Sequence, residues 1–313
     1  MLEKFFKLSE NGTDVRTEIV AGITTFMTMA YILAVNPNVL SATGMDHGAV
    51  FTATALASLI GTLLMALLAN YPFALAPGMG LNAYFAYTVV LGMGYTWQVA
   101  LTAVFVEGIV FIVLSLTNVR EQIFNAIPMN LKSAVSVGIG LFIAFIGLQN
   151  AHIVIGGATL VELFSLDGYN ASTGLEATTS DVGITVLLAI IGVVITGILV
   201  IKNVKGNILW GILITWLLGI ICQFTGLYVP NPDVSCYSLL PDFSNGLSIP
   251  SLAPIFGKLQ FDGIFTLDFA VVVFAFLFVD MFDTIGTLIG VSSKANMLDE
   301  EGKLPQIKGA LLA

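Results

Sequence analysis

Long apolar runs separated by short polar stretches dominate the chain. A run of about 20 apolar residues fits a helix that crosses the hydrocarbon core of a membrane. The pattern predicts crossings at about residues 18–36, 48–70, 97–117, 132–150, 182–201, 206–226 and 265–291. A shorter apolar segment covers about 73–92, and a further run begins near Ile307. We therefore predict an all-α, polytopic membrane protein.

The segment 71–85 is interrupted by prolines and glycines. Pro72 and Pro77 lack an amide donor and disfavour helix in the residue before them, so we predict extended backbone from Phe73 to Ala76. Gly78 permits backbone conformations closed to other residues, and helix can resume near Met79. Non-helical backbone at membrane depth survives only where protein or a water-filled cavity satisfies it. This broken crossing therefore predicts a polar socket of the kind found in secondary transporters.

Polar side chains lie in and near this socket. Asn82 is one turn into the resumed helix, and its carboxamide offers donors and an acceptor to a heterocycle with mixed edges. A helix–helix hydrogen bond or a helix cap would also account for it. In the first crossing, Thr24, Thr25 and Thr28 form a stripe with Gly22. Such a stripe either packs helices closely or lines a cavity.

Composition strengthens the membrane interpretation. Hydrophobic residues make up 57% of the 313 residues and charged residues 10%, with a mean hydropathy of +0.95. Soluble domains carry about 25% charged residues. Against this background an acid inside a crossing needs a purpose, because a charge at the bilayer centre costs about 2.5–3.5 kcal/mol on insertion scales.

Two such acids, Asp280 and Asp283, lie in the crossing 265–291. They are three residues apart and share one helix face, which Thr284 and Thr287 extend. Burial and a second nearby acid both favour the protonated form of a carboxyl group. One aspartate could then exchange protons near neutral pH or accept a hydrogen bond from a ring N–H. The alternative is a structural pair bonded to other helices.

The basic residues indicate how the chain is oriented. If residues 1–17 are cytoplasmic, ten of the 11 basic residues fall on the cytoplasmic side, as the positive-inside rule requires. They are Lys4, Lys7, Arg16, Arg120, Lys132, Lys202, Lys205, Lys294, Lys303 and Lys308, whereas Lys258 lies outside. This balance holds only if the segment 73–92 crosses the membrane. We expect a multi-pass protein of the cell membrane with extracytoplasmic loops at 151–181 and 227–262.

Four stretches together resemble the AzgA-like branch of nucleobase transporters, the adenine, guanine and hypoxanthine permeases. They are ITTFMTMAYILAVNP (23–37), ALAPGMGLNAYF (74–85), FVDMFDTIGTLIG (278–290) and MLDEEGKLP (297–305). The resemblance covers essentially the whole chain in matching order. It implies a seven-plus-seven inverted-repeat fold whose third and tenth segments are half strand and half helix, with a purine bound between them.

The resemblance also implies roles for individual residues. Asp280 would bind the base and, with Asp283, couple transport to protons. Asn82 would recognise the purine, and main-chain groups from Phe73 to Ala76 would touch it. Together with the polar or small residues noted above, the predicted substrate site is Asp280, Asn82, Phe73, Ala74, Ala76, Gly78, Thr28 and Thr284.

The implied fold divides the chain into four parts. These are the cytoplasmic N-terminus (1–17), the first repeat with its broken third segment (18–226), an extracytoplasmic loop (227–262) and the start of the second repeat (263–313). The apolar run that begins near Ile307 stops at Ala313. We therefore expect the sequence to be a C-terminally truncated portion of a longer protein, without the tenth segment.

These observations favour proton-coupled uptake of a purine base by alternating access. A non-transporting, truncated membrane protein and an anion transporter of the same fold remain alternatives, although an anion site would call for basic residues near the broken segment. A membrane enzyme would need His or Cys beside the aspartates. We expect no enzymatic activity, cofactor, metal or nucleic acid. The expected partners are a purine, protons and the lipid bilayer, and a homodimer is left open.

Overall fold

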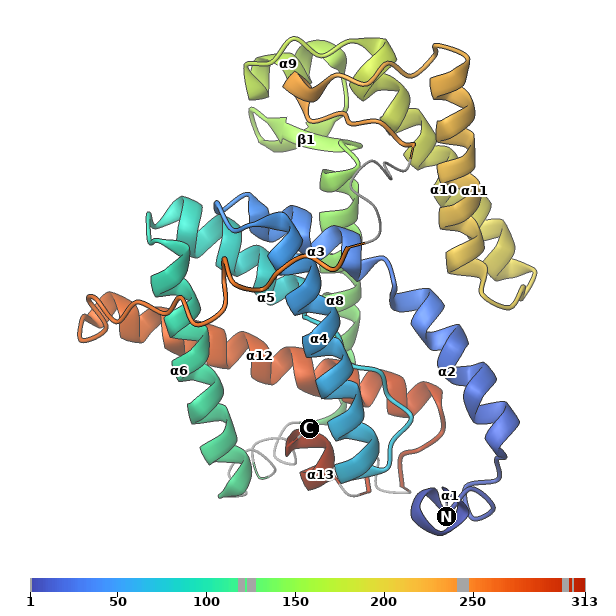
Figure 1. Cartoon of the computed structure of the whole chain (residues 1–313), viewed down its shortest axis with the longest axis vertical. Coiled ribbons are helices and arrows are strands. Elements are labelled where there is room, and N and C mark those ends of the chain that lie inside the picture. The colour runs from blue at the N-terminus through green and yellow to red at the C-terminus, as the bar shows by residue number, and fades with distance from the viewer. Residues whose placement is uncertain are drawn as a thin grey trace. The chain divides into compact units, whose positions relative to one another are not determined.

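The computed structural model describes residues 2–117, 122, 128–240, 248–299, 304, 305 and 307–312. It is mainly helical (Figure 1). Within these residues six helical spans are long and apolar enough to cross a membrane: Val15–Ser41, His47–Ala69, Trp97–Leu116, Thr179–Ile201, Asn207–Phe224 and Leu267–Lys294. The predicted polytopic, helical class is confirmed. Arg120 and Lys303, used in the charge count, lie outside the described residues.

The chain divides into two compact units. The first comprises residues 1–143 and 249–313, and the second comprises residues 144–248. The helices of the first unit are α1 (Leu2–Phe6), α2 (Val15–Met29), α3 (Ile32–Ser41), α4 (His47–Leu64), α5 (Met79–Ala83), α6 (Trp97–Leu116), α12 (Leu267–Lys294) and α13 (Ile307–Leu312). Helix α8 (Met129–Asn150) contributes to both units.

Short polar side chains start four of these helices. Each accepts a hydrogen bond from a backbone N–H of the first turn, which would otherwise lack a partner. The capping residues are Asp14 for α2, Asp46 for α4, Thr96 for α6 and Thr266 for α12. The positions at which these four helices start are thus determined by residues next to them in the sequence.

The first predicted crossing is bent. It consists of α2 and α3, which are separated at Ala30 and Tyr31. The threonine stripe explains part of this, because the hydroxyl groups of Thr24, Thr25 and Thr28 all donate to carbonyl oxygens of α2 itself. Hydrogen bonds of this kind weaken and often bend a helix.

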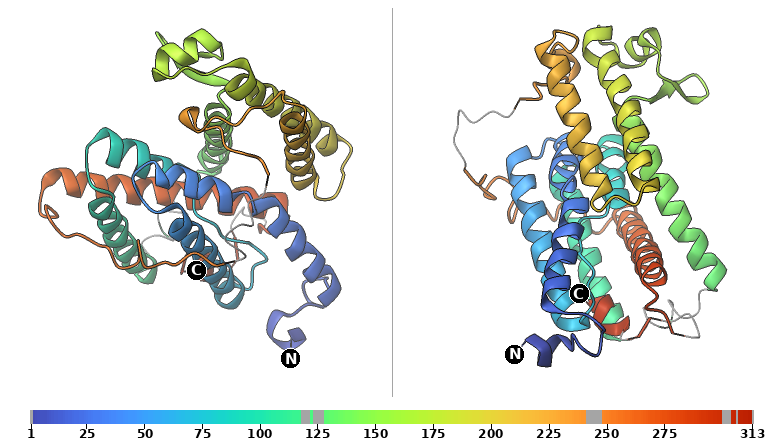
Figure 2. Two further views of the ribbon diagram at one scale, coloured as in Figure 1. Left: turned by 45° about the horizontal axis from the view of Figure 1, so that its top comes forward. Right: turned by 90° about the vertical axis from the view of Figure 1, so that its right-hand side faces the viewer.

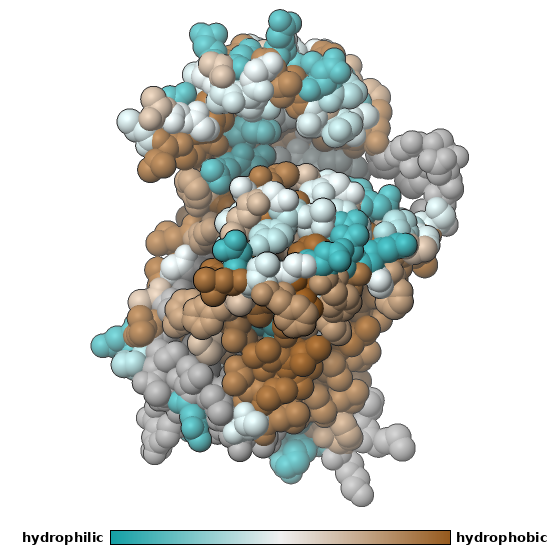
Figure 3. All heavy atoms as spheres, turned by 90° about the vertical axis from the view of Figure 1, so that its left-hand side faces the viewer, coloured by the Kyte–Doolittle hydropathy of each residue, from teal (hydrophilic) through white to brown (hydrophobic). Residues whose placement is uncertain are grey.

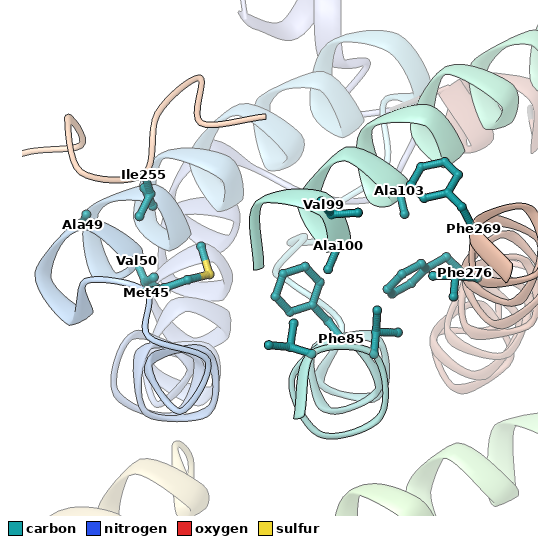
Figure 4. Packing of buried hydrophobic residues seen from close by; sticks show 13 residues of the cluster. Met45, Ala49, Val50, Phe85, Val99, Ala100, Ala103, Ile255, Phe269 and Phe276 are labelled. Atoms are coloured by element: carbon teal, nitrogen blue, oxygen red, sulfur yellow. The ribbon is translucent and has the colours of Figure 1, made fainter. Parts of the chain in front are cut away.

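A hydrophobic cluster joins α4, α5, α6 and α12 (Figure 4). Phe276 of α12 lies at its centre, with the ring of Tyr84 edge-on at 5.1 Å. The figure shows Phe269 and Phe276 approaching Ala100 and Ala103 of α6. These small residues let the helices approach closely. The resumed helix is thereby held against two long crossings.

The broken crossing follows α4 directly. The last turn of α4 widens into a π-helix at Met65–Ala69, and Asn70 ends it in the left-handed conformation that asparagine tolerates. Residues 71–78 have no regular structure, and α5 begins at Met79, as predicted. A second π-helix, Tyr84–Gly92, continues α5.

The predicted short strand has no ladder partner in the described part of the chain. Instead, the hydroxyl group of Thr62 in α4 satisfies both backbone groups of Leu75: it accepts from the N–H at 2.9 Å and donates to the carbonyl at 3.3 Å. A single side chain thus supplies the hydrogen bonds to Leu75 that a neighbouring strand would supply. Residues 71–78 are therefore irregular backbone and not a strand, and the strand prediction needs this correction.

Helix α13 packs against the end of α4. A Cβ atom added to Gly309 would lie 2.8 Å from the carbonyl oxygen of Leu68, so the two backbones touch. The Tyr71 hydroxyl donates to the carbonyl of Pro305. A cluster of buried apolar side chains packs around this contact. It comprises Met65, Ala69, Phe73, Leu288, Ile289, Leu304, Ala310 and Leu311.

The second unit contains a hairpin and two long helices. Strands β1 (Val154–Gly157) and β2 (Leu160–Leu163) pair antiparallel, and α9 (Leu166–Thr173) follows. Helices α10 (Ile184–Ile201) and α11 (Asn207–Phe224) lie side by side in both views of Figure 2. The hairpin and α9 lie within the loop expected at 151–181.

Glycines and threonines hold α10 and α11 together reciprocally. A Cβ atom at Gly192 of α10 would lie 2.5 Å from Thr215 Oγ1, and one at Gly211 of α11 would lie 2.0 Å from Thr196 Oγ1. Each threonine thus sits over the glycine of the other helix. Close approach through small residues is typical of helix pairs in membranes.

The outer surface is strongly apolar. Figure 3 shows a broad area of hydrophobic residues on the face that it presents. On α6 the large side chains that are about half exposed are Phe105, Ile109, Ile112, Val113 and Leu116. Such an area far exceeds what soluble monomers expose and marks a surface that contacts lipid or protein.

Candidate functional site

A cavity of about 620 Å³ lies within the first unit, beside the broken crossing. Five parts of the chain form its walls: the bend between α2 and α3, the irregular segment before α5, α5 itself with its π-helical continuation, α8, and α12. The lining residues are Met29, Tyr31, Ile32, Ala76, Pro77, Gly78, Met79, Gly80, Tyr84, Gly138, Phe142, Ile143, Phe278, Val279, Phe282, Asp283 and Thr287. Its size suits a small organic ligand.

Asp283 brings a carboxylate to this mostly apolar cavity. Its Oδ2 atom lies against the backbone of Gly78, because a Cβ atom added there would be 2.8 Å from that oxygen. Only glycine leaves room for this approach. Within the described residues the carboxylate forms no hydrogen bond or ion pair, and it is the one acidic group that lines the cavity. An ionised carboxylate accepts hydrogen bonds only, so it suits a ligand that presents N–H groups.

Aromatic rings form much of the wall. Phe278 and Phe282 of α12 pack with ring centroids 4.7 Å apart, and Tyr84 and Phe142 line the cavity from α5's continuation and α8. Gly80 leaves space for the Phe142 ring, which an added Cβ atom would meet at 3.4 Å. Planar heterocycles stack favourably on aromatic side chains. The cavity thus combines stacking surfaces with a single charged acceptor.

The α12 side of the cavity follows from helical spacing. Val279, Asp283 and Thr287 are four residues apart and therefore lie along one stripe, with Phe278 and Phe282 beside it. Asp280 is three residues before Asp283 and falls outside the lining stripe. The predicted sharing of one face by the two aspartates is thus only approximate.

Two of the predicted substrate-site residues, Ala76 and Gly78, line this cavity. Asp283, which was predicted for proton coupling, lines it as well. Phe73 and Ala74 instead line a second cavity of about 460 Å³ between α2, α4 and the irregular segment, which Ala76 also reaches. The irregular segment thus borders both cavities, and Ala76 is the residue of this segment that lines both.

The other predicted residues lie elsewhere. The Thr28 hydroxyl donates to the carbonyl of Thr25 inside α2. Asp280 and Thr284 are partly exposed on α12, outside the stripe that lines the larger cavity. Their assignment to the substrate site stays a prediction.

Asn82 also lies away from the larger cavity. Its side-chain amide donates to the Oδ1 atom of Asn36 in α3. The sequence pattern did not single out Asn36, because one asparagine in an apolar run carries no spacing signal. The aromatic lining was missed for the same reason, since phenylalanines are common in every crossing. Only the stripe around Asp283 could have been read from i, i+4 spacing.

Comparison with known proteins gives independent evidence about the family of this chain. The model of a family described as the Permease family matches residues 16–313. A protein of Methanocaldococcus jannaschii named as a permease is 50% identical over 313 residues, covering 100% of this chain and 65% of its own length. The guanine/hypoxanthine permease PbuG of Bacillus subtilis is 45% identical, covering 100% of this chain and 67% of its own length. The adenine permease AdeP of Escherichia coli is 41% identical, covering 99% and 63%. The chain thus spans about two thirds of the length of these relatives.

Proposed function

Because the chain belongs to the Permease family, we propose that the protein transports purine nucleobases across the cell membrane. The relatives named above for guanine, hypoxanthine and adenine support a purine as the substrate. On this proposal the protein moves its substrate without changing it and is not an enzyme. The N-terminus is cytoplasmic, as the distribution of basic residues indicates.

The observation that carries the proposal is the carboxylate of Asp283 against Gly78 in a cavity with aromatic walls. A purine has two flat faces for stacking and at least one ring N–H for the carboxylate. Main-chain groups near Ala76 and Gly78 are the further partners we assign to it. The same carboxylate would repel an anion, so an anion substrate is disfavoured.

We assign proton coupling to the aspartates of α12. A carboxyl group in a low-dielectric cavity changes its protonation when a ligand or water replaces its surroundings. Asp283 faces the cavity, and Asp280 lies one turn away on the same helix. Proton and purine would then cross together while the cavity opens to one side of the membrane at a time.

Uptake of labelled hypoxanthine, guanine and adenine tests the proposal. The intact natural protein would be produced in cells that lack their own purine uptake. We expect saturable uptake of at least one base, loss of that uptake in Asp283→Asn, and inhibition by a protonophore. Uracil should not compete. Absence of purine uptake by the unaltered protein would refute the proposed function, and uptake that ignores a protonophore would refute the coupling.

A further inference from the structure

Two buried side chains and one partly buried side chain link the resumed helix to α3 and α4. Asn82 of α5 donates to Asn36 of α3, and Asn36 Nδ2 donates to Thr54 Oγ1 of α4 at 2.7 Å. Asn36 and Thr54 have 3% and 2% of their surface exposed. Polar groups buried this deeply are costly unless they are paired, so each link depends on the next.

The Thr54 end of this series of hydrogen bonds fixes which group donates and which accepts in each of them. The Thr54 hydroxyl donates to the carbonyl of Val50 at 2.7 Å, so its oxygen can only accept from Asn36. Asn36 must therefore turn its NH₂ group to Thr54 and its carbonyl oxygen to Asn82. That carbonyl accepts from the NH₂ group of Asn82. One backbone carbonyl in α4 thus sets the orientation of the amide on α5.

This series of hydrogen bonds holds α5 on the side away from Gly80 and Tyr84, whereas Met79, three residues before Asn82, also lines the cavity. Gly80 and Tyr84 are four residues apart and line the cavity, whereas Asn82 lies midway between them on the helix. Two residues correspond to about half a turn, so Asn82 faces away from Gly80. The Asn82–Asn36 hydrogen bond fixes the rotation of α5, and with it the place of the cavity wall.

We propose that Asn36 is a positioning residue of the transport site, which acts on the substrate through Asn82 and the helix α5. The inference rests on the proposed function, because it concerns the same cavity. It assigns Asn82 a different task from the direct recognition that the family resemblance implies. A direct contact would discriminate among purines, whereas a positioning contact affects all of them alike.

Uptake kinetics of Asn36→Ala, Asn82→Ala and the double variant test this assignment. Loss of one buried hydrogen bond should raise KM about tenfold. The double variant should be no worse than either single one, because both remove the same link. A panel of purine analogues should weaken by one common factor. The matched control is Asn38→Ala, since Asn38 lies on the same helix but is exposed and bonds His47.

A second pair of variants guards against misfolding. Thr54→Val keeps the shape but removes the hydroxyl group, and should raise KM about threefold or more. Thr54→Ser keeps the hydroxyl group and should match the unaltered protein. Independently of transport, hydrogen exchange of residues 79–92 in the purified protein should quicken in Asn36→Ala and not in Asn38→Ala.

Several results would overturn the proposal. Analogue-specific losses in Asn82→Ala, or losses that multiply in the double variant, would show direct contact with the base. Unchanged hydrogen exchange of residues 79–92 in Asn36→Ala would show that the link does not hold α5. Failure of the unaltered protein to take up purines would instead refute the proposed function, and the exchange measurement would still decide the role of Asn36.

Discussion

At the scale of single residues, the contact between Gly78 and Asp283 is the most constrained part of the cavity. Gly78→Ala would place a methyl group 2.8 Å from Asp283 Oδ2, so the carboxylate or the backbone must shift. A shift of the carboxylate by a fraction of an ångström from its working position lowers the efficiency of a site by about tenfold or more. We expect KM for uptake to rise about tenfold.

Gly138→Ala is the matched control for this substitution. Gly138 lines the same cavity, but an added Cβ atom there would meet nothing within 4 Å. It should leave KM close to that of the unaltered protein. Equal kinetics in the two variants would contradict the role that we give to the Gly78–Asp283 contact.

His152, beside the hairpin of the second unit, makes stability there depend on pH. Its ring packs edge-on against Tyr169 at 5.0 Å, and partial burial lowers the pKa of the imidazole below its usual value. The unfolded state, with its ordinary pKa of about 6.5, then binds protons more readily. Its contribution to stability is therefore complete above about pH 6.5 and is lost as pH falls towards the lowered pKa of the folded state.

Hydrogen exchange of residues 153–173 as a function of pH measures this effect. Protection against exchange, corrected for the intrinsic exchange rate at each pH, should fall as pH drops below about 6.5 in the unaltered protein. His152→Gln removes the titrating ring and should flatten the profile. A steep profile that survives in His152→Gln would assign the dependence to another group.

At the scale of elements, the pair α10–α11 depends on its glycines. Gly211→Ala would bring a Cβ atom 2.0 Å from Thr196 Oγ1, so the helices must separate. Overpacking of this kind costs about 1–3 kcal/mol. We expect a lower melting temperature of the protein in detergent.

Two further variants identify the cause. Gly197→Ala lies on α10, where an added Cβ atom meets nothing within 4 Å, and should melt like the unaltered protein. Adding Thr196→Ala to Gly211→Ala removes the hydroxyl oxygen and the Cγ2 methyl group that the new side chain would meet, but leaves the Thr196 Cβ atom 2.9 Å away, so it should restore part of the loss. If the double variant melts no higher than Gly211→Ala alone, the reciprocal packing is not the source of stability.

Elements were the part of the fold that local sequence patterns could predict. The crossing predicted at 97–117 is α6, Trp97–Leu116, and the helix after Pro77 resumes at Met79 as proposed. The bend between α2 and α3 was missed, because threonine hydroxyls can bond their own helix without changing hydropathy. The partner of Asn82 could not be predicted, since Asn36 lies 46 residues away and only packing joins them.

At the scale of the whole molecule, the positive-inside pattern predicts the orientation in the membrane. Lys202 and Lys258 are both exposed and fall on opposite predicted sides. In a background with Cys222→Ala and Cys236→Ala, an impermeant maleimide added outside intact cells should label Lys258→Cys. Lys202→Cys should react only after permeabilisation. The reverse labelling pattern would contradict the proposed topology.

The contact of α13 with the end of α4 also bears on how the protein is made. Tyr71 and its partner Pro305 are 234 residues apart. At about 5–20 residues per second, a ribosome needs on the order of ten to fifty seconds to bridge that interval. During this time Met65, Ala69 and Phe73 are already synthesised without the partners that later cover them. The broken crossing thus enters the membrane well before the segment that covers it is made, so its unfinished form must be sheltered by lipid or by the insertion machinery.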